Sequence, residues 1–341
     1  MDPVVAIVGA TGAVGELMCR VVVERQLPFR EIRFLASERS VGKQIVFKGQ
    51  AHTVRALSQE AFHGVDIVLS STPASVSRQW SPVAASAGAT VVDNSSAWRM
   101  DSDVPLVVPE VNANAMDRIP KGIVANPNCS TIQMVVALKP LHDISRIKRI
   151  VVSTYQASSG KGATGLADLD AQVRALGSGQ PLPQATAHVD RLAGNVLAHD
   201  WKPGEDDYSE EEWKMIRETR KIMNDDSIQV SATTVRVPVR TGHSESINIE
   251  FHQPLSVEQA RKALSKAPGV ILADKPGTQF APTPAQCEGL DEVFVGRLRK
   301  DSTVPFGLNM WVVADNLRKG AATNAVQIAD LLIKSGNMKR R

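Results

Sequence analysis

A glycine-rich turn near the N-terminus constrains the fold of this chain more than any other feature. The apolar run Val4–Val8 leads directly into Gly9–Gly15, which has the spacing G-x-x-G-x-x-G, and a helical stretch at Val14–Arg25 follows. Glycines at this spacing let the backbone turn tightly and approach a ligand closely. The N–H groups and the positive dipole end of the helix suit a pyrophosphate. The pattern predicts a dinucleotide-binding domain of the Rossmann type.

Short apolar strands alternate with helical stretches through the first third of the chain. Besides Val4–Val8, the expected strands are Ile32–Ala36, Asp66–Ser70, Thr90–Val92 and Ile123–Ala125, and a second helix is expected at Val76–Ala87. Strand–helix alternation produces crossover connections, which are almost always right-handed. We therefore expect an α/β domain with a doubly wound parallel sheet.

The pattern changes after about residue 130, where strands become longer and alternate polar with apolar residues. This is typical of an α+β domain with a mixed or antiparallel sheet. A glycine- and proline-rich loop, Gly177–Pro203, is long enough to be functional or interface-forming. The expected strands are Arg149–Gln156, Thr233–Val239, Ser246–His252, Glu292–Arg299 and Asn309–Ala314, and the expected helices are Gly162–Leu176, Ser209–Asn224, Ser256–Ala267 and about Leu317–Lys334.

Composition excludes several classes of protein. The chain has 341 residues, enough for two domains, and a net charge of only +3, so a nucleic-acid platform is not expected. Its apolar runs are too short to span a membrane, and Met1 is followed by a strand, not a targeting leader. We therefore expect a cytoplasmic protein. The three cysteines fit neither a disulfide framework nor a metal site, and Cys19 and Cys287 are expected to be structural or incidental.

The end of the second strand bears on the choice of dinucleotide. An enzyme that uses NAD usually places an acidic residue there for the ribose 2′-hydroxyl. This chain has Arg39, Ser40 and Lys43, which could bind a 2′-phosphate. Glu38, an acidic residue, is the one member of the segment that would instead favour NAD. We expect NADP, with contacts from Gly9, Thr11, Gly12, Ala13, Val14, Gly15, Ser37, Arg39 and Ser40.

Cys129 stands apart from the other two cysteines. It lies in the polar segment Asn126–Thr131, where the last strand of the first domain ends and the apolar helical run Ile132–Leu138 begins. A thiol at a helix N-terminus has its thiolate stabilised by the dipole and by unpaired N–H groups. The surroundings are too polar for an ordinary core cysteine, so Cys129 is predicted to be a nucleophile.

These motifs together resemble the aspartate-semialdehyde dehydrogenase family over nearly the whole chain, in its short bacterial form. The resemblance implies interconversion of aspartate semialdehyde and aspartyl phosphate with NADP and inorganic phosphate, through a thioester on the cysteine. It also implies a place on the route to lysine, methionine, threonine and diaminopimelate. The segments that carry it are Gly9–Gly15, Leu35–Lys43, Asn94–Arg99, Pro109–Asn112, Asn126–Thr131, Thr154–Gly160, Glu211–Lys214, Arg236–His243 and Asn316–Ala321.

The resemblance assigns roles to residues that spacing alone leaves open. His243 would be the acid–base residue, and Gln156 would orient the acyl group. The guanidinium of Arg236 would bind the substrate carboxylate in a bidentate manner. The other six histidines are expected to be structural. Glu211 would bind the substrate ammonium group and Lys214 the phosphate, although by sequence alone a solvated ion pair is the preferred explanation of their E-x-x-K spacing.

The resemblance also completes the phosphate site, the cofactor site and the domain division. Arg99 and Asn128 would join Lys214 at the phosphate, and Ser159, Gly160 and Asn316 would meet the nicotinamide end of NADP. No metal is implied. The last helix would fold back, so that residues 1–128 and about 317–338 form the NADP domain and 129–316 a catalytic and dimerisation domain. A homodimer, or a dimer of dimers, is expected.

Two other readings remain. N-acetyl-γ-glutamyl-phosphate reductase runs the same chemistry on an acylated substrate, for which a carboxylate such as Glu211 has no ammonium group to meet. A non-catalytic paralogue that only binds nucleotide would have no need for Cys129, Gln156, Arg236 and His243, all of which are present.

Overall fold

The computed structural model describes residues 2–198 and 200–338. The chain divides into two compact units, Met1–Pro127 with Ala321–Arg341 (unit 1) and Asn128–Gly320 (unit 2). Each unit has its own six-stranded sheet. The chain thus leaves unit 1 just before Cys129 and returns to it near the start of the last helix.

Unit 1 is built on a parallel sheet of strand order β5-β2-β1-β6-β7-β8. The chain starts in the middle, at β1, and winds outward in both directions, which is the doubly wound arrangement predicted from the sequence. Because both faces are covered, β1 and β6 to β8 are buried along their whole length. The strands are β1 (Val4–Val8), β2 (Glu31–Ala36), β5 (Arg55–Ala56), β6 (Ile67–Ser70), β7 (Thr90–Asp93) and β8 (Ile123–Ala125).

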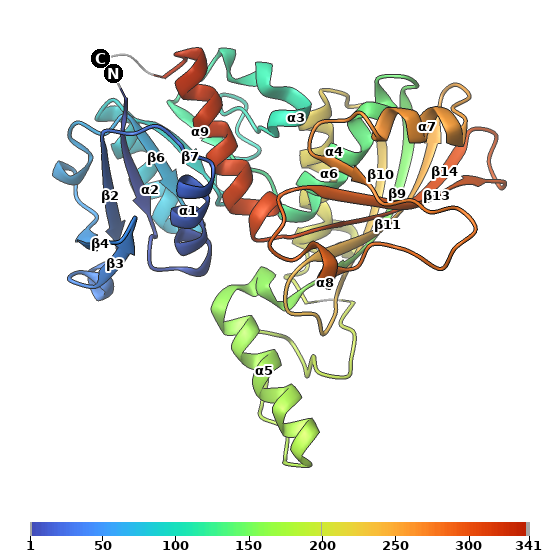
Figure 1. Cartoon of the computed structure of the whole chain (residues 1–341), viewed down its shortest axis with the longest axis horizontal. Coiled ribbons are helices and arrows are strands. Elements are labelled where there is room, and N and C mark those ends of the chain that lie inside the picture. The colour runs from blue at the N-terminus through green and yellow to red at the C-terminus, as the bar shows by residue number, and fades with distance from the viewer. Residues whose placement is uncertain (1, 199, 339–341) are drawn as a thin grey trace. The chain divides into compact units, whose positions relative to one another are not determined.

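The helices of unit 1 cover this sheet (Figure 1). Helix α1 (Ala13–Glu24) packs on β1 and beside α9 (Thr323–Ser335), which also touches β6 and β7, while α2 (Ala74–Ser86) packs on β7 and β8. A short hairpin, β3 (Gln44–Phe47) and β4 (Gln50–Thr53), was not predicted, since its polar residues and the turn at Lys48 and Gly49 mask the alternation. The short helix α3 (Pro109–Asn112) lies against α9.

Unit 2 is built on a mixed sheet of strand order β10-β9-β11-β14-β13-β12. The outer pairs β10/β9 and β12/β13 are parallel and the inner pairs are antiparallel, which confirms the predicted α+β domain. The strands are β9 (Ile147–Gln156), β10 (Gln229–Arg236), β11 (His243–Phe251), β12 (Val270–Leu272), β13 (Val293–Asp301) and β14 (Gly307–Ala314).

Three helices pack against the mixed sheet and one projects from it (Figure 1). Helices α4 (Cys129–His142), α6 (Glu210–Met223) and α7 (Val257–Leu264) contact its strands, whereas α5 (Gly162–Ser178) extends away. Ser209 caps α6 in a reciprocal capping box with Glu212. Another short helix, α8 (Pro284–Cys287), touches β14.

Several element boundaries differ from expectation, and two of them have a clear physical cause. Strand β10 ends at Arg236, three residues before the expected end, because Pro238 has no N–H to continue the ladder. The last α-helix begins at Thr323 instead of about Leu317, since Arg318–Ala322 forms a π-helical turn. The Asp315 carboxylate accepts the N–H groups of Leu317 and Arg318, at 2.9 and 3.1 Å, and starts the turn there.

Candidate active site

The glycines of the Gly9–Gly15 turn differ in how much space the structure leaves for a side chain. Gly9 has φ +80°, and a Cβ there would lie 2.3 Å from the Ser71 carbonyl oxygen. A Cβ on Gly15 would lie 2.1 Å from the Gly9 carbonyl oxygen. At Gly12 an added Cβ meets only the Gly9 oxygen at 3.4 Å, an ordinary contact. Packing therefore requires glycine at 9 and 15, whereas at 12 it leaves the backbone open to approach by a ligand.

The polar segment after β2 lies beside this turn. The Thr11 and Ser40 hydroxyl groups are 3.1 Å apart, so the first and second strand–helix connections touch. Ser37 precedes a short 3₁₀ turn, and both Glu38 and Arg39 are exposed on it. The remaining residues of the predicted set, Ala13 and Val14, begin helix α1.

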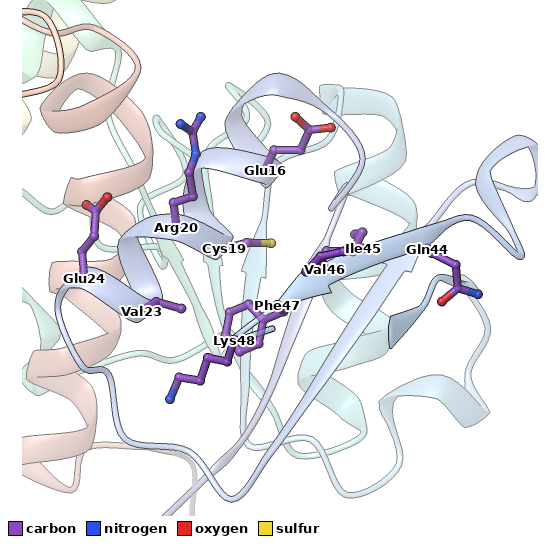
Figure 2. Close-up of a pocket in the computed structure, with 10 residues that line it drawn as sticks. All are labelled: Glu16, Cys19, Arg20, Val23, Glu24, Gln44, Ile45, Val46, Phe47 and Lys48. Atoms are coloured by element: carbon purple, nitrogen blue, oxygen red, sulfur yellow. The ribbon is translucent and has the colours of Figure 1, made fainter. Parts of the chain in front are cut away.

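The environments of the three cysteines differ. Burial raises the pKa of Cys19 to about 12, and burial together with Asp315 does the same for Cys287. Cys19 lines a groove of about 510 Å³ between α1 and β3, in which none of the predicted site residues lies (Figure 2). Cys129 instead is half-buried at the first position of α4. Gly320 packs against it, since a Cβ on Gly320 would lie 2.8 Å from the Cys129 Cβ.

Asn128 holds the backbone that presents Cys129. Its Oδ1 caps α4 by accepting the N–H groups of Ser130 and Thr131 at 3.0 and 3.2 Å. Its Nδ2 donates to Glu211 Oε1 at 2.7 Å, and its own backbone N–H donates to Glu218 Oε2 at 2.7 Å. Two carboxylates of α6 thus fix the residue that precedes the thiol.

Glu211 points inward and connects several predicted site residues. Besides Asn128, its Oε1 lies 3.4 Å from Gln156 Nε2, and its Oε2 lies 3.2 Å from Lys214 Nζ. Burial would raise the pKa of Glu211, but the Lys214 ammonium and the Asn128 amide more than offset this, so the pKa lies below its usual value. Glu211 is therefore a buried, ionised carboxylate.

Arg236 is buried at the end of β10. Its Nη1 donates to the Ala157 carbonyl at 2.7 Å and its Nε to Asp200 Oδ2 at 3.0 Å, while its guanidinium lies 4.6 Å over the Trp201 ring. Arg240, by contrast, forms an exposed ion pair with Asp170. The structure thus separates the two arginines of the segment Arg236–His243.

His243 is buried at the start of β11. Its Nδ1 accepts the backbone N–H of Ala157 at 3.0 Å, and its Nε2 has no hydrogen-bond partner among the described residues. Burial and the nearby Arg236 charge hold its pKa well below the usual value. Gly160 lies against both, because a Cβ there would be 2.9 Å from Arg236 Nη1 and 3.5 Å from His243 Nε2.

The residues predicted to meet the nicotinamide lie beside this cluster in unit 2. Ser159 Oγ donates to Asn316 Oδ1 at 3.1 Å, and the Gly242 N–H donates to the same oxygen at 2.9 Å. Asn316 thus joins the Ser159–Gly160 turn to the segment that carries His243. The Lys161 ammonium, whose role the sequence leaves open, donates to the Asp200 carbonyl at 2.8 Å.

Arg99 belongs to unit 1, whereas the other predicted catalytic, substrate and phosphate residues belong to unit 2. It is buried, and it donates from Nε to the Asn126 carbonyl at 3.0 Å and from Nη2 to the Asn94 carbonyl at 2.8 Å. Two backbone carbonyls therefore fix the guanidinium next to the chain segment that leads to Cys129.

Sequence reasoning missed three acidic residues of this site. Glu218 is seven residues after Glu211, so both lie on one face of α6, and this spacing could have indicated it. Glu245 is two residues after His243 on β11 and faces the same way. Asp200 lies in the long loop that was expected to be functional, but its partner Arg236 is 36 positions away, so no local pattern marks it.

Neither a metal site nor a membrane span emerges from the described residues. They contain no group of three or more His, Cys, Asp or Glu side chains that could hold a metal ion. None of their helices combines the length and the apolar character needed to cross a bilayer.

Comparison with known proteins identifies both units. Residues 4–119 match the family model of the semialdehyde dehydrogenase NAD binding domain, and residues 138–319 match that of the semialdehyde dehydrogenase dimerisation domain. The aspartate-semialdehyde dehydrogenase of Aquifex aeolicus (strain VF5) is 57% identical over 334 residues, which cover 97% of this chain and 98% of the relative.

Solved structures agree with this. Aspartate semialdehyde dehydrogenase II from Vibrio cholerae, complexed with ASA, superposes with a TM-score of 0.95 at 45% identity, over 98% of this chain and 99% of that one. The Candida albicans enzyme with NADP superposes with a TM-score of 0.77 at 25% identity, over 99% of this chain and 100% of that one.

Proposed function

The chain belongs to the aspartate-semialdehyde dehydrogenase family, and on that premise we propose that it interconverts L-aspartyl 4-phosphate and L-aspartate 4-semialdehyde through a thioester on Cys129. It is an oxidoreductase of amino-acid biosynthesis, on the route to lysine, methionine, threonine and diaminopimelate. The observation that carries the thioester proposal is the position of Cys129 at the N-terminus of α4, behind a residue that two carboxylates fix.

Cys129 is the nucleophile in this proposal. The dipole of α4 stabilises a thiolate at its first position, and the half-buried position leaves it accessible to a substrate. The thiolate attacks the acyl phosphate carbon, and phosphate leaves with the electrons of the broken C–O bond. In the opposite direction, phosphate attacks the thioester and the thiolate leaves.

Substrate binding falls to Arg236, Glu211 and Gln156. The Arg236 guanidinium suits the α-carboxylate, since a planar donor can bind it in a bidentate manner. The ionised Glu211 carboxylate suits the ammonium group, and the Gln156 amide beside it orients the acyl group. Lys214, Arg99 and Asn128 bind the phosphate; Asn128 uses one of its two amide N–H bonds on Glu211 and keeps the other.

His243 is the acid–base residue at the reacting carbonyl. Negative charge builds up on the carbonyl oxygen each time the carbon becomes tetrahedral, and a hydrogen bond from Nε2 stabilises it. Nε2 suits this task because no described protein group uses it. When the tetrahedral species formed on reduction of the thioester collapses to the semialdehyde, the C–S bond breaks and the thiolate of Cys129 is restored.

NADP fits the residues of unit 1. The open backbone at Gly12 and the start of α1 would hold its pyrophosphate, and Ser37, Arg39 and Ser40 its 2′-phosphate. Ser159, Gly160 and Asn316 of unit 2 are assigned to its nicotinamide end. When bound, the cofactor supplies or takes up the hydride. A titration that follows cofactor fluorescence should give a lower Kd for NADP than for NAD.

The match to a dimerisation domain supports a homodimer built on unit 2, with a dimer of dimers as the larger assembly. Sedimentation analysis would separate a monomer, a dimer and a tetramer. We also propose a cytoplasmic location for this enzyme of amino-acid biosynthesis.

The variant C129A tests the proposal. After incubation with aspartyl phosphate and an acid quench, mass spectrometry should find an aspartyl group on Cys129 of the wild type and none in C129A. Turnover in C129A should fall by about 10⁴-fold or more, while its affinity for NADP stays within about twofold of the wild-type value. Undiminished turnover in C129A would refute the covalent mechanism.

A further inference from the structure

A chain of buried polar side chains lies behind Arg236 in unit 2. Ser158 Oγ is 2.9 Å from His188 Nε2, and His188 Nδ1 is 2.9 Å from Asp200 Oδ2, the oxygen that also accepts from Arg236 Nε at 3.0 Å. All four side chains are buried. His188 and Asp200 come from the long loop between α5 and α6, so the loop is tied to the site through this chain.

The order serine, histidine, aspartate resembles that of a hydrolase, but Ser158 cannot act as a nucleophile here. Its hydroxyl group donates a 2.6 Å hydrogen bond to the Gly165 carbonyl. The residue is fully buried, so no substrate can reach the oxygen. The hydrogen-bonded series of Ser158, His188 and Asp200 must therefore have a different purpose.

Counting protons fixes the state of His188. Ser158 has one hydroxyl hydrogen, and it lies between Oγ and the Gly165 carbonyl oxygen, because two oxygens 2.6 Å apart would repel without a hydrogen between them and a carbonyl carries none. Ser158 Oγ must then accept from His188 Nε2, which requires a proton on Nε2. Nδ1 faces a carboxylate oxygen, which requires a proton on Nδ1 as well. The geometry thus demands an imidazolium with both ring nitrogens protonated.

Asp200 is the anion that holds this cation. Its Oδ2 also lies 3.4 Å from Lys161 Nζ, and its Oδ1 accepts the Val189 N–H at 3.1 Å. Burial would raise the pKa of Asp200, but His188, Val189, Arg236 and Lys161 together hold it well below its usual range. Three cations, His188, Arg236 and Lys161, therefore surround one carboxylate.

One further charge faces His188, from helix α5. The Asp168 carboxylate accepts the backbone N–H groups of Thr186 and Ala187, at 2.7 and 2.6 Å, and so holds the segment directly before His188. Its pKa is lowered, since these bonds and the His188 charge outweigh burial. Even with Asp168 included, the cluster keeps an excess of positive charge.

We propose that His188 is a positioning residue, held as an imidazolium, that fixes Asp200 and thereby sets the orientation and the surrounding positive charge of Arg236 for an anionic substrate. This rests on the proposed role of Arg236 as the ligand of the substrate α-carboxylate. Loss of one proton from His188 would break its bond to Ser158 or to Asp200. Arg236 would then bind the carboxylate less well, while Cys129 would keep its place at the start of α4.

Two measurements test this. In ¹⁵N-histidine-labelled wild-type enzyme without substrate, the His188 signals, assigned by their absence from H188N, should show both ring nitrogens protonated at pH 7. A singly protonated ring would overturn the proposal whatever the enzyme's activity. This measurement needs only the folded wild-type protein and an assignment, which H188Q can supply if H188N does not fold.

The second measurement is kinetic. H188N and H188Q should raise KM for aspartate semialdehyde by about tenfold, as expected for loss of a charge-assisted hydrogen bond, while kcat changes by less than about threefold. The matched control H252N alters an exposed histidine of the same unit and should leave both constants unchanged. An unchanged KM in both variants would overturn the proposal, whereas no turnover in the wild type and H252N would contradict the proposed function instead.

Discussion

The backbone N–H of Ala157 donates a 3.0 Å hydrogen bond to Nδ1 of His243. A nitrogen that accepts a hydrogen bond has no proton, so the neutral ring must carry its proton on Nε2. Burial and the charge of Arg236 lower the pKa of His243, which keeps the ring neutral at pH 7. The same Ala157 peptide accepts from Arg236, so one peptide group fixes both Arg236 and His243.

The first prediction concerns this tautomer. Nitrogen NMR of the wild type should show His243 protonated on Nε2 alone between pH 6 and pH 8. In H243N, kcat should fall by about 10²- to 10⁴-fold, the usual range for loss of an acid–base group, with KM changed by less than about threefold. A ring protonated on Nδ1 would contradict the assignment of Nε2 as the donor to the carbonyl oxygen.

The second prediction concerns the buried Glu245. Burial raises its pKa well above the usual value, which the Gln133 side chain only partly offsets. Both carboxyl oxygens and Gln133 Oε1 have no hydrogen-bond partner among the described residues. A neutral carboxyl would satisfy both groups, since its O–H can donate to Gln133 Oε1. Gln133 Nε2 in turn lies 3.4 Å from the His243 carbonyl.

The sign of the pH dependence follows from this state. Above the unfolded pKa of about 4.3 the unfolded chain releases the proton of Glu245, whereas the folded protein keeps it, so this residue makes stability fall as pH rises. E245Q removes that dependence and should be more stable than the wild type by about 1 kcal/mol or more at pH 8. Urea denaturation at pH 5 and pH 8 measures this. E250Q, on the same strand but partly exposed, should follow the wild type.

The third prediction separates the glycines of the first turn. Packing leaves room for a Cβ at Gly12 but not at Gly15. G12A should therefore keep the wild-type Tm within about 2 °C, since no contact is strained, but raise the Kd for NADP by about tenfold, because the backbone can no longer approach the pyrophosphate. G15A should lower Tm instead. Unaltered NADP affinity in a folded G12A would contradict the assigned cofactor site.

Local patterns account for the parts of the fold that the sequence predicts. Buried strands such as β1 and β6 read as apolar runs, and α6 has both a cap and an amphipathic face. The hairpin β3–β4 was missed, because short, half-exposed strands lack such a pattern.

In the candidate active site, too, some features follow from local spacing and others only from contacts between distant positions. The family resemblance, with the spacing E-x-x-K, selected Glu211 and Lys214, but the hydrogen bond that turns Glu211 inward comes from Asn128, 83 positions earlier. The chain of Ser158, His188 and Asp200 likewise joins residues 12 to 30 positions apart. Spacing cannot reveal such contacts, because only the folded topology brings their partners together.

The fourth prediction uses Glu211 to distinguish substrates. If its carboxylate binds the substrate ammonium group, E211Q should raise KM for aspartate semialdehyde by about tenfold or more. E210Q is a matched control, because Glu210 is exposed on the same turn of α6. The N-acetylated semialdehyde of glutamate has no ammonium group and should be a poor substrate of the wild type. Faster turnover of that compound would indicate an N-acetyl-γ-glutamyl-phosphate reductase.

The last prediction concerns Glu218, which touches no substrate in the proposed mechanism. Its carboxylate accepts the N–H of Asn128 at 2.7 Å, and Asn128 caps the helix that begins with Cys129. E218L leaves that buried N–H without an acceptor and should reduce kcat by about tenfold, since the thiol is displaced from its position. E218Q still offers an amide oxygen and should keep kcat within about threefold of the wild-type value. The rate of Cys129 alkylation should follow the same order, because it reports the thiolate without any substrate. Equal kcat and equal alkylation rates in E218L and the wild type would show that the position of Cys129 does not depend on this carboxylate.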